Sequence, residues 1–239
     1  MSSGEPIQNG LNTAAGASVY SPVVLKLYDW WVLGISNRFA WQCSTKNVLL
    51  PFFKKHLSKK HLDVGVGTGF YLSHTGLTES NQVTLFDLNA NSLRVAAGRV
   101  KRAEVRVVAG DVMQASCELQ ERDYDSISLF YLLHCLPGTM GDKEAAILNL
   151  SRYLSRNGVL YGATVLGDEV DHNRLGRLLM KIYNRRGLFS NRMDSIDSLR
   201  CLLRRHFESV QVWQHNKVAL FVTRDPVMAE IDVPSPERS

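Results

Sequence analysis

The stretch Leu62-Asp63-Val64-Gly65-Val66-Gly67-Thr68-Gly69 decides the fold class of this chain. A short apolar run that contains one acid leads into three glycines at alternate positions. Glycine has no Cβ, so the backbone turns sharply there and a ligand can come close to it. A helix that begins directly after such a turn points its free N–H groups at the ligand. The pattern therefore predicts a nucleotide-binding turn between a strand and a helix.

The spacing of the glycines separates two kinds of nucleotide site. A dinucleotide fingerprint places its third glycine three residues after the second. Here that position is Phe70, and the third glycine comes one residue earlier, at Gly69. The acid before the first glycine, Asp63, suits a ligand that carries a positive charge at this strand end. The pattern D-x-G-x-G-x-G resembles the cofactor loop of class I S-adenosylmethionine-dependent methyltransferases.

Short apolar segments recur after the glycine turn and predict the strands of one sheet. They cover residues 62–64, 83–87, 105–108, 124–130 and 159–165, with helical patterns between them. This alternation implies a parallel sheet with helices on both faces. Residues 207–213 and 218–223 then alternate like the two strands of a hairpin. The resemblance implies an antiparallel last strand. The expected fold is therefore α/β: a Rossmann-like, seven-stranded, mostly parallel sheet with an N-terminal helical lid and a small cap insertion.

Acids follow three of these strands, at the edge where ligands of open α/β sheets bind. Asp87 is placed to accept hydrogen bonds from the two ribose hydroxyls of a nucleotide. The resemblance implies that Asp111 bonds the adenine amino group and that Val112 packs on the ring. The expected cofactor is S-adenosylmethionine, with S-adenosylhomocysteine as its product, and no metal site is expected. The expected cofactor contacts are Tyr28, Asp63, Gly65, Gly67, Asp87, Leu88, Asp111, Val112 and Tyr131.

Aromatic and titratable residues supply the candidates for acceptor binding and catalysis. Aromatic faces attract a sulfonium cation, and the resemblance implies that Tyr28 closes over the methionine part of the cofactor. His134, just beyond the fourth strand, is the candidate general base. The alternative for His134 is a hydrogen-bonded core histidine. The candidates for substrate contact are Tyr20, Arg38, Trp41 and His172, with Arg38 placed to hold a carboxylate.

Length and composition favour one globular domain, since 239 residues with 45% hydrophobic and 21% charged side chains can bury one good core. The expected organisation is a flexible N-terminus (1–17), one methyltransferase domain (18–224) and a flexible tail (225–239). Within the domain, residues 18–57 form N-terminal helices and residues 168–191 form the cap. The lack of a long apolar run and the four scattered cysteines favour a cytoplasmic enzyme without a transmembrane segment.

A basic region overlaps the cap. Residues 171–206 hold nine bases and three acids, a net charge of +6 against +5 for the whole chain. Two interpretations stay open: a solvated face, or a platform for an anionic substrate, nucleic acid or a membrane surface. Nucleic acid is the less favoured partner, because few aromatic side chains interleave with the bases.

These patterns favour in-line methyl transfer to an O, N or S acceptor on a small molecule, of the type found in natural-product biosynthesis. The short cap favours a metabolite over a macromolecule. No Asn-Pro-Pro-Tyr-type motif follows the fourth strand, which disfavours methyltransferases of base-amino and amide groups. Two alternatives remain: a cyclase or pericyclase that uses the bound sulfonium as a fixed charge, and a non-catalytic binding or regulatory protein. The oligomeric state is left open.

Overall fold

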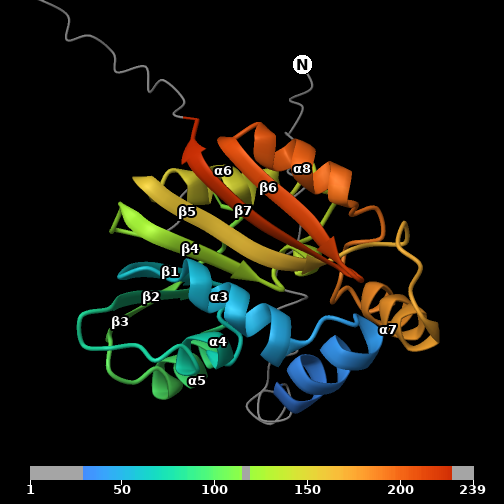
Figure 1. The fold of residues 1–239 in the computed structure, drawn as a ribbon, viewed down its shortest axis with the longest axis horizontal. Helices are drawn as coiled ribbons and strands as arrows, with labels where there is room; N and C mark the ends of the chain where they lie inside the picture. The colour runs from blue at the N-terminus through green and yellow to red at the C-terminus, as the bar shows by residue number, and fades with distance from the viewer. Residues whose placement is uncertain (1–28, 115–118, 228–239) are drawn as a thin grey trace, which may run out of the picture.

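One twisted sheet organises the computed structural model in Figure 1. The structure describes residues 29–114 and 119–227, with side chains from Gly34 onward. Seven strands lie in the order β3-β2-β1-β4-β5-β7-β6. Their bounds are β1 Lys60–Val64, β2 Gln82–Asp87, β3 Glu104–Ala109, β4 Tyr124–Phe130, β5 Leu154–Val165, β6 Phe207–His215 and β7 Val218–Pro226.

The pairing of the strands confirms the predicted fold. Strands β3, β2, β1, β4 and β5 run parallel, whereas β7 runs antiparallel to both of its neighbours. A turn at Asn216 and Lys217 joins β6 to β7, and Asn216 has the left-handed φ of 52° that such a hairpin turn requires. The strand that comes last along the described chain therefore lies inside the sheet, and β6 forms its edge.

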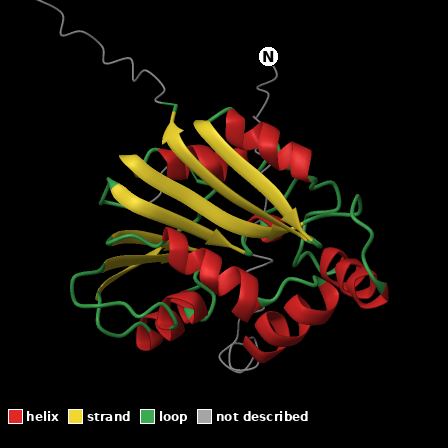
Figure 2. Cartoon of the chain, viewed as in Figure 1, coloured by secondary structure: helices red, strands yellow, loops and turns green. Residues whose placement is uncertain are grey.

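Helices cover both faces of the sheet (Figure 2). Their bounds are η1 Asp29–Ala40, η2 Thr45–Leu49, α3 Leu50–His56, α4 Phe70–Ser73, α5 Ala90–Arg99, η3 Leu133–Cys135, α6 Glu144–Ser151, α7 Arg174–Arg185 and α8 Ile196–Arg204. The sequence also predicts a helix over residues 45–56, and the π-helical η2 followed by α3 confirms it. The chain accepts Pro51 there because it lies in the first turn of α3, where a backbone N–H has no partner within the helix.

Two apolar cores lie on opposite faces, because side chains alternate along each strand. On one face Phe130 and Tyr161 pack with Phe53 of α3. On the other face Ile127 and Leu129 belong to the cluster that also contains the buried leucines of α8. The helices hold the sheet on both sides and leave its carboxyl edge to the loops.

Two predictions about helices were wrong. The four-residue spacing of Ala146, Leu150 and Leu154 predicts one helix, and the spacing of Leu175, Leu178, Leu179 and Ile182 predicts one apolar helical face in the cap. Leu154 was expected in the helix before the fifth strand, but α6 ends at Ser151 and Leu154 begins β5, where it pairs with Tyr124 beside an irregularity in the register. In α7, Leu178 was expected on the buried face with Leu179, yet Leu178 is 53% exposed. Leu178 lies four residues after Arg174, so it shares the outward side of the helix with that arginine.

Candidate active site

The glycine turn after β1 has the backbone geometry that its sequence predicts. Gly65, Gly67 and Gly69 have φ angles of +73°, +53° and +71°, a region that residues with a Cβ rarely adopt. A Cβ on Gly65 would lie 3.0 Å from the side chain of Leu132, and one on Gly69 would lie 2.9 Å from the Cα of Ala96 in α5. The turn is therefore packed closely between α5 and the loop that follows β4.

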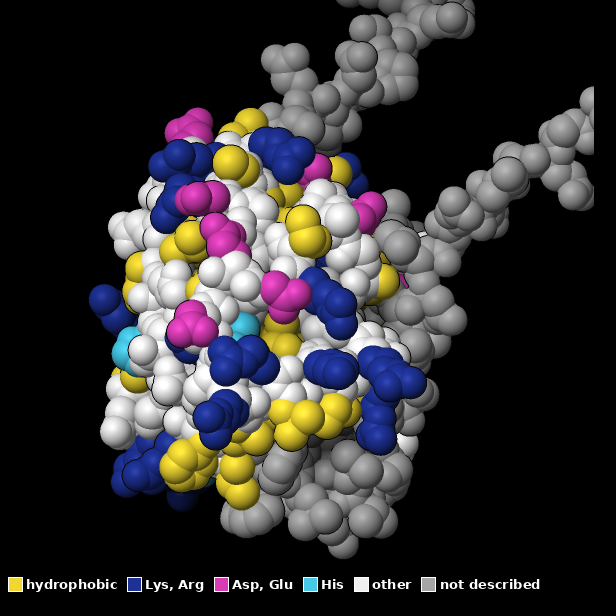
Figure 3. Space-filling model, turned by 90° about the vertical axis from the view of Figure 1, so that its right-hand side faces the viewer, with side chains coloured by type: hydrophobic (Ala, Val, Ile, Leu, Met, Phe, Trp, Pro, Cys, Tyr) yellow, Lys and Arg dark blue, Asp and Glu magenta, His cyan; other side chains and the backbone are white. Residues whose placement is uncertain are grey.

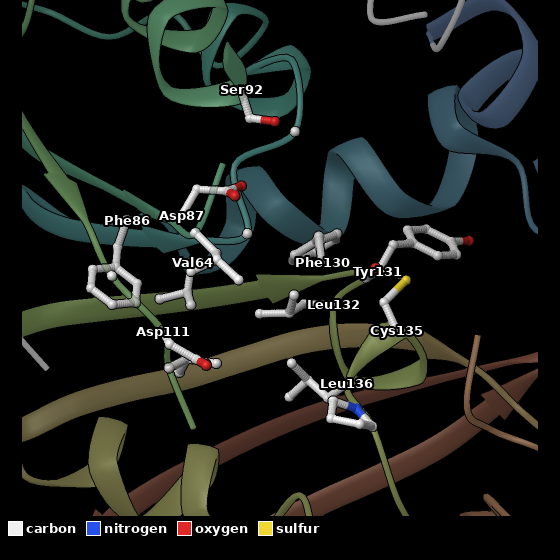
Figure 4. A pocket seen from close by; sticks show the side chains of 16 residues that line it. Val64, Phe86, Asp87, Ser92, Asp111, Phe130, Tyr131, Leu132, Cys135 and Leu136 are labelled. Carbon is white, nitrogen blue, oxygen red and sulfur yellow. Dashed lines mark hydrogen bonds between the residues drawn. The ribbon is translucent and has the colours of Figure 1, made fainter. Parts of the chain in front are cut away.

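A cleft opens beside this turn at the carboxyl edge of the sheet (Figure 4). It measures about 770 Å³ when its open side is included. The residues that line it are Val64, Gly65, Gly67, Phe86, Asp87, Leu88, Ser92, Gly110, Asp111, Val112, Phe130, Tyr131, Leu132, Cys135, Leu136 and Pro137. They come from the ends of β1, β2, β3 and β4, as expected for a ligand site in an open α/β sheet.

Asp87 is held at one side of the cleft by backbone N–H groups. Its carboxylate accepts a hydrogen bond of 2.8 Å from Asn89 N and further bonds from the backbone of Gly67, Val66 and Leu88. Burial raises the pKa of Asp87 to about 6, although these hydrogen bonds act in the opposite direction. The carboxylate thus sits between the glycine turn and Ser92, where it can accept hydrogen bonds from a diol.

A narrow apolar slot with an acid beside it lies at the end of β3. The space opposite Gly110 is filled by the ring of Phe86, since a Cβ on Gly110 would lie 2.8 Å from that ring. Asp111 accepts a hydrogen bond of 2.9 Å from Met113 N, and Asn149 Nδ2 donates to Val112 O at 2.9 Å. These bonds fix the loop, so that flat apolar groups and one carboxylate face the cleft. The glycine turn, the Asp87 carboxylate and this slot fit the adenosine part of a cofactor.

Seven of the expected cofactor contacts line the cleft: Gly65, Gly67, Asp87, Leu88, Asp111, Val112 and Tyr131. Tyr131 holds a left-handed φ of 60°, and its N–H donates to Ala163 O at 2.8 Å. This strained backbone bends the chain directly after β4 and leads it across the cleft. Tyr28 lies outside the described residues.

Asp63 does not line the cleft, contrary to the expectation. Its side chain lies on the face of the sheet opposite to that of Val64, where Ser128 Oγ donates to its Oδ1 at 2.5 Å. The same hydroxyl lies 3.1 Å from His61 Nε2. Burial raises the pKa of Asp63 to about 7, and the nearby Asp87 adds to this effect. Asp63 is therefore part of a buried polar chain beneath the glycine turn.

Three of the substrate candidates, Arg38, Trp41 and His172, are described by the structure, and none of them lines the cleft. Trp41 is buried and packs on Phe189 and, edge to face, on His172. His172 is also buried, with its Nε2 at 2.9 Å from Gly167 O. Arg38 is exposed over the ring of Phe39. Trp41 and His172 thus serve the packing between the N-terminal helices and the cap. Tyr20 lies outside the described residues.

The hydrogen bonds of His134 speak against the role of a base. Val165 N donates to His134 Nδ1 at 3.2 Å, and a backbone N–H can only donate. The proton of the neutral ring is therefore on Nε2, and the basic lone pair on Nδ1 is already occupied. Burial, with a contribution from Lys143, lowers the pKa of His134 to about 3. The ring is a neutral hydrogen-bond donor between Tyr131 and Phe189.

A buried ion pair connects the segment that follows the cap to the loop after β4, and the sequence analysis did not predict it. Lys143 Nζ donates to Asp194 Oδ2 at 2.5 Å and to Ser190 O at 2.8 Å, with both side chains almost fully buried. Ser190 N also donates to His134 O at 2.8 Å. We call residues 187–194 the strap. Lys143 and Asp194 are 51 residues apart in the sequence, so a spacing pattern could not predict that they pair.

The described residues contain no group of acids, histidines and cysteines arranged to hold a metal ion. No helix in that part of the chain has the length and apolar character needed to cross a membrane.

Comparisons with known proteins agree with this geometry. A family model described as a methyltransferase domain matches residues 62–162. The uncharacterized protein YbcY of Escherichia coli K12 is 46% identical over 79% of this chain and 97% of its own length. The physcion biosynthesis cluster O-methyltransferase of Aspergillus chevalieri is 37% identical over 90% of this chain and 96% of its own. The complex of DhpI with SAH superposes with a TM-score of 0.62 and 16% identity over 91% of this chain and 98% of the other, and shows the fold alone.

The fold and the cleft define a Rossmann-like enzyme with an open cleft at the carboxyl edge of its sheet. Relatives match it at 37% and 46% identity over most of its length, and the chain belongs to the methyltransferase family, as a class I S-adenosylmethionine-dependent enzyme.

Proposed function

We propose that this methyltransferase acts on an oxygen atom of a small natural product, with the cleft as the site of its cofactor. The observation that carries the proposal is the cleft itself, which combines the glycine turn, Asp87 and the slot beside Asp111. The name of the Aspergillus chevalieri relative supports an oxygen acceptor and a biosynthetic setting. A nitrogen or sulfur acceptor is the alternative.

Each part of the cleft has a task in this proposal. Asp87 accepts hydrogen bonds from the ribose hydroxyls, Asp111 accepts one from the adenine amino group, and Phe86 with Val112 sandwiches the ring. Gly65 and Gly67 let the backbone approach the methionine part. S-adenosylmethionine supplies, when bound, an electrophilic methyl group on a positively charged sulfur. The residues of the chain hold the two reactants in line and keep water away.

His134 contributes a hydrogen bond rather than a proton acceptor. The Val165 N–H bond at the other nitrogen fixes its proton on Nε2. The ring is buried and lies behind the residues that line the cleft, so this donor stabilises negative charge on an acceptor oxygen that enters between Tyr131 and Phe189, without changing its own charge. An acceptor hydroxyl that ionises readily, such as a phenol or an enol, suits such a donor better than an aliphatic alcohol. The sequence-based assignment of His134 as a base is replaced by this role.

Calorimetric titration with S-adenosylmethionine and S-adenosylhomocysteine tests the cofactor site. Gly67→Ala adds a Cβ to a residue that lines the cleft at a φ of +53°, and it is expected to weaken the binding of both by more than about tenfold. Gly76→Ala is the matched control, because Gly76 also has a positive φ, of 75°, but a Cβ there meets no atom within 4 Å. If Gly67→Ala and Gly76→Ala bind the cofactor with equal affinity, the glycine turn is not part of the cofactor site.

The same titration tests the ribose contact through Asp87→Ala. A lost charge-assisted hydrogen bond in a buried site costs about 1.5–3 kcal/mol, so affinity is expected to fall by more than about tenfold. Asp168→Ala, which alters an exposed acid, is expected to bind normally. Mass spectrometry with a panel of phenols, carboxylic acids and amines then separates the alternatives. Gain of one CH₂ supports a transferase, conversion without that gain supports a cyclase, and binding without conversion supports a non-catalytic protein.

A further inference from the structure

Helix α7 carries a narrow basic stripe on its outward side. Arg174, Arg177, Lys181 and Arg185 are all exposed, at spacings of three and four residues that place them in one row. From His172 to Met193 the chain has six bases and no acid. The row is therefore the outward side of the helix and not a set of scattered charges.

Few of these bases have an acidic partner in the described part of the chain. Arg177 lies 3.3 Å from Asp171, but their side chains are 62% and 96% exposed, so the pair is weak. No salt bridge is found there for Arg174, Lys181 or Arg185. The positive charge of the stripe is therefore not neutralised by acids of the same molecule, and it is available to an anionic ligand.

Apolar side chains border the stripe. Leu178, 53% exposed, lies one residue after Arg177 and three before Lys181, and Ile182 beyond it is half-buried. Phe39 of η1 is 54% exposed, and its carbonyl accepts a hydrogen bond of 2.6 Å from Asn173 Nδ2 at the start of α7. Figure 3 shows basic side chains in a row across this face, with a band of hydrophobic side chains below them and the acidic ones above.

The inner side of α7 is fixed to the protein. Leu179 and Met180 are buried in the core, and Asn173 caps the helix by accepting from Gly176 N at 2.8 Å. The backbone of Gly176 packs close to Ala40 O of η1. The outward side is thus presented rigidly, so docking needs no folding of the helix and little loss of conformational entropy.

We propose that the outward side of α7 docks this enzyme on an anionic lipid bilayer surface. Arginine and lysine pair with lipid phosphate and serine headgroups, and the bordering Leu178 and Phe39 reach into the interface, as in amphipathic surface helices. A nucleic acid is a poorer match, because no aromatic ring stands between the four basic side chains, Phe39 lies only at their border, and an exposed leucine separates the charges. The inference does not rest on the proposed acceptor or on the cofactor cleft.

Vesicle sedimentation at low salt tests the proposal with the full-length chain. Vesicles of phosphatidylcholine with about one third phosphatidylserine are expected to bind it, and pure phosphatidylcholine vesicles are not. Lys181→Gln/Arg185→Gln is expected to weaken binding about thirtyfold, the equivalent of about 1 kcal/mol for each charge. Lys54→Gln/Lys55→Gln removes two exposed charges from α3 and is expected to bind like the unaltered protein.

A second pair of variants tests the apolar border. Leu178→Ser is expected to lower vesicle binding several-fold, whereas Val107→Ser, which alters a 48% exposed valine on the β3 edge, is expected to leave it unchanged. Circular dichroism checks that each variant is folded. Absence of binding at low salt, or equal binding of the two double variants, overturns the proposal. A mobility shift of RNA or DNA that depends on Lys181 and Arg185, without vesicle binding, assigns the stripe to nucleic acid instead.

Discussion

At the scale of single residues, Asp63 holds its proton more tightly than an exposed aspartate does. Burial raises the pKa of its carboxyl to about 7 from its usual value of 3.8. Because the folded-state pKa is the higher one, the stability that Asp63 contributes is fully present below about pH 4. It is lost as the pH rises through about 7.

The free energy of unfolding is therefore expected to fall between about pH 4 and pH 7, as measured by urea denaturation. Asp63→Asn cannot ionise and keeps an acceptor for Ser128, so it is expected to reduce this slope and to be the more stable protein at neutral pH. Some slope remains from Asp87, whose pKa is raised to about 6. Asp125→Asn, at an exposed position in β4, is the control. An unchanged slope in Asp63→Asn contradicts the prediction.

His134 gives a second prediction at this scale. A glutamine amide can reproduce the Nε2–H donor, whereas His134→Asn keeps only the acceptor for Val165 N. The donor role therefore predicts that His134→Gln retains a substantial fraction of turnover and that His134→Asn loses about tenfold or more. The unaltered enzyme and His134→Gln are expected to show the same dependence of kcat on pH between pH 5 and 8. If kcat of the unaltered enzyme instead depends on a group that titrates in this range, and both variants are inactive, His134 acts as a base.

The sequence could identify residues whose role follows from backbone geometry and could not identify those whose role depends on burial. The positions of Gly65, Gly67 and Asp87 follow from a turn pattern that is local in the chain. Trp41 and His172 carry functional groups, but contacts between η1 and the cap bury them, and these contacts join distant parts of the sequence. The tautomer of His134 depends in the same way on Val165, 31 residues away.

At the scale of elements, a buried ion pair helps to hold the strap in place. Lys143→Met is expected to cost about 3–5 kcal/mol of unfolding free energy, because it leaves the carboxylate of Asp194 buried without its partner. Among the residues that the structure describes, the Oδ1 atom of Asp194 already lacks a hydrogen-bond partner, so no other group there compensates. Lys143→Met/Asp194→Leu is expected to recover most of that loss. Urea denaturation at neutral pH measures both, and equal losses in the single and double variants would contradict the ion-pair account.

The strands were easier to predict than the helices that flank them. Residues 83–87 and 124–130 are short apolar runs between polar turns, and β2 and β4 match them closely. The start of β5 at Leu154 was missed because the apolar residues 146, 150 and 154 fit a helix period, and only pairing with Tyr124 decides otherwise. The outward place of Leu178 was missed because leucine is usually buried in an amphipathic helix.

At the scale of the whole molecule, the cleft joins the ends of four strands, so a bound ligand is expected to stabilise the entire fold. S-adenosylhomocysteine at about one hundred times its Kd adds about 2.7 kcal/mol to the free energy of unfolding. Hydrogen exchange is expected to slow in residues 65–69, 87–92, 110–113 and 131–137 and to stay unchanged in α7. Stabilisation without protection of these loops would place the ligand elsewhere.

The position of β7 has a consequence for how the protein is made. This strand leaves the ribosome after the other six strands that the structure describes, yet it fills the gap between β5 and β6. Until it emerges, the nascent chain exposes the open edge of β5 and a β6 that has no neighbour, and both can pair with other chains. A chain that is truncated before residue 218 therefore has an incomplete sheet with unpaired strand edges and is expected to aggregate or to be degraded. Completion of the sheet therefore depends on residues 218–226, which pair with both β5 and β6.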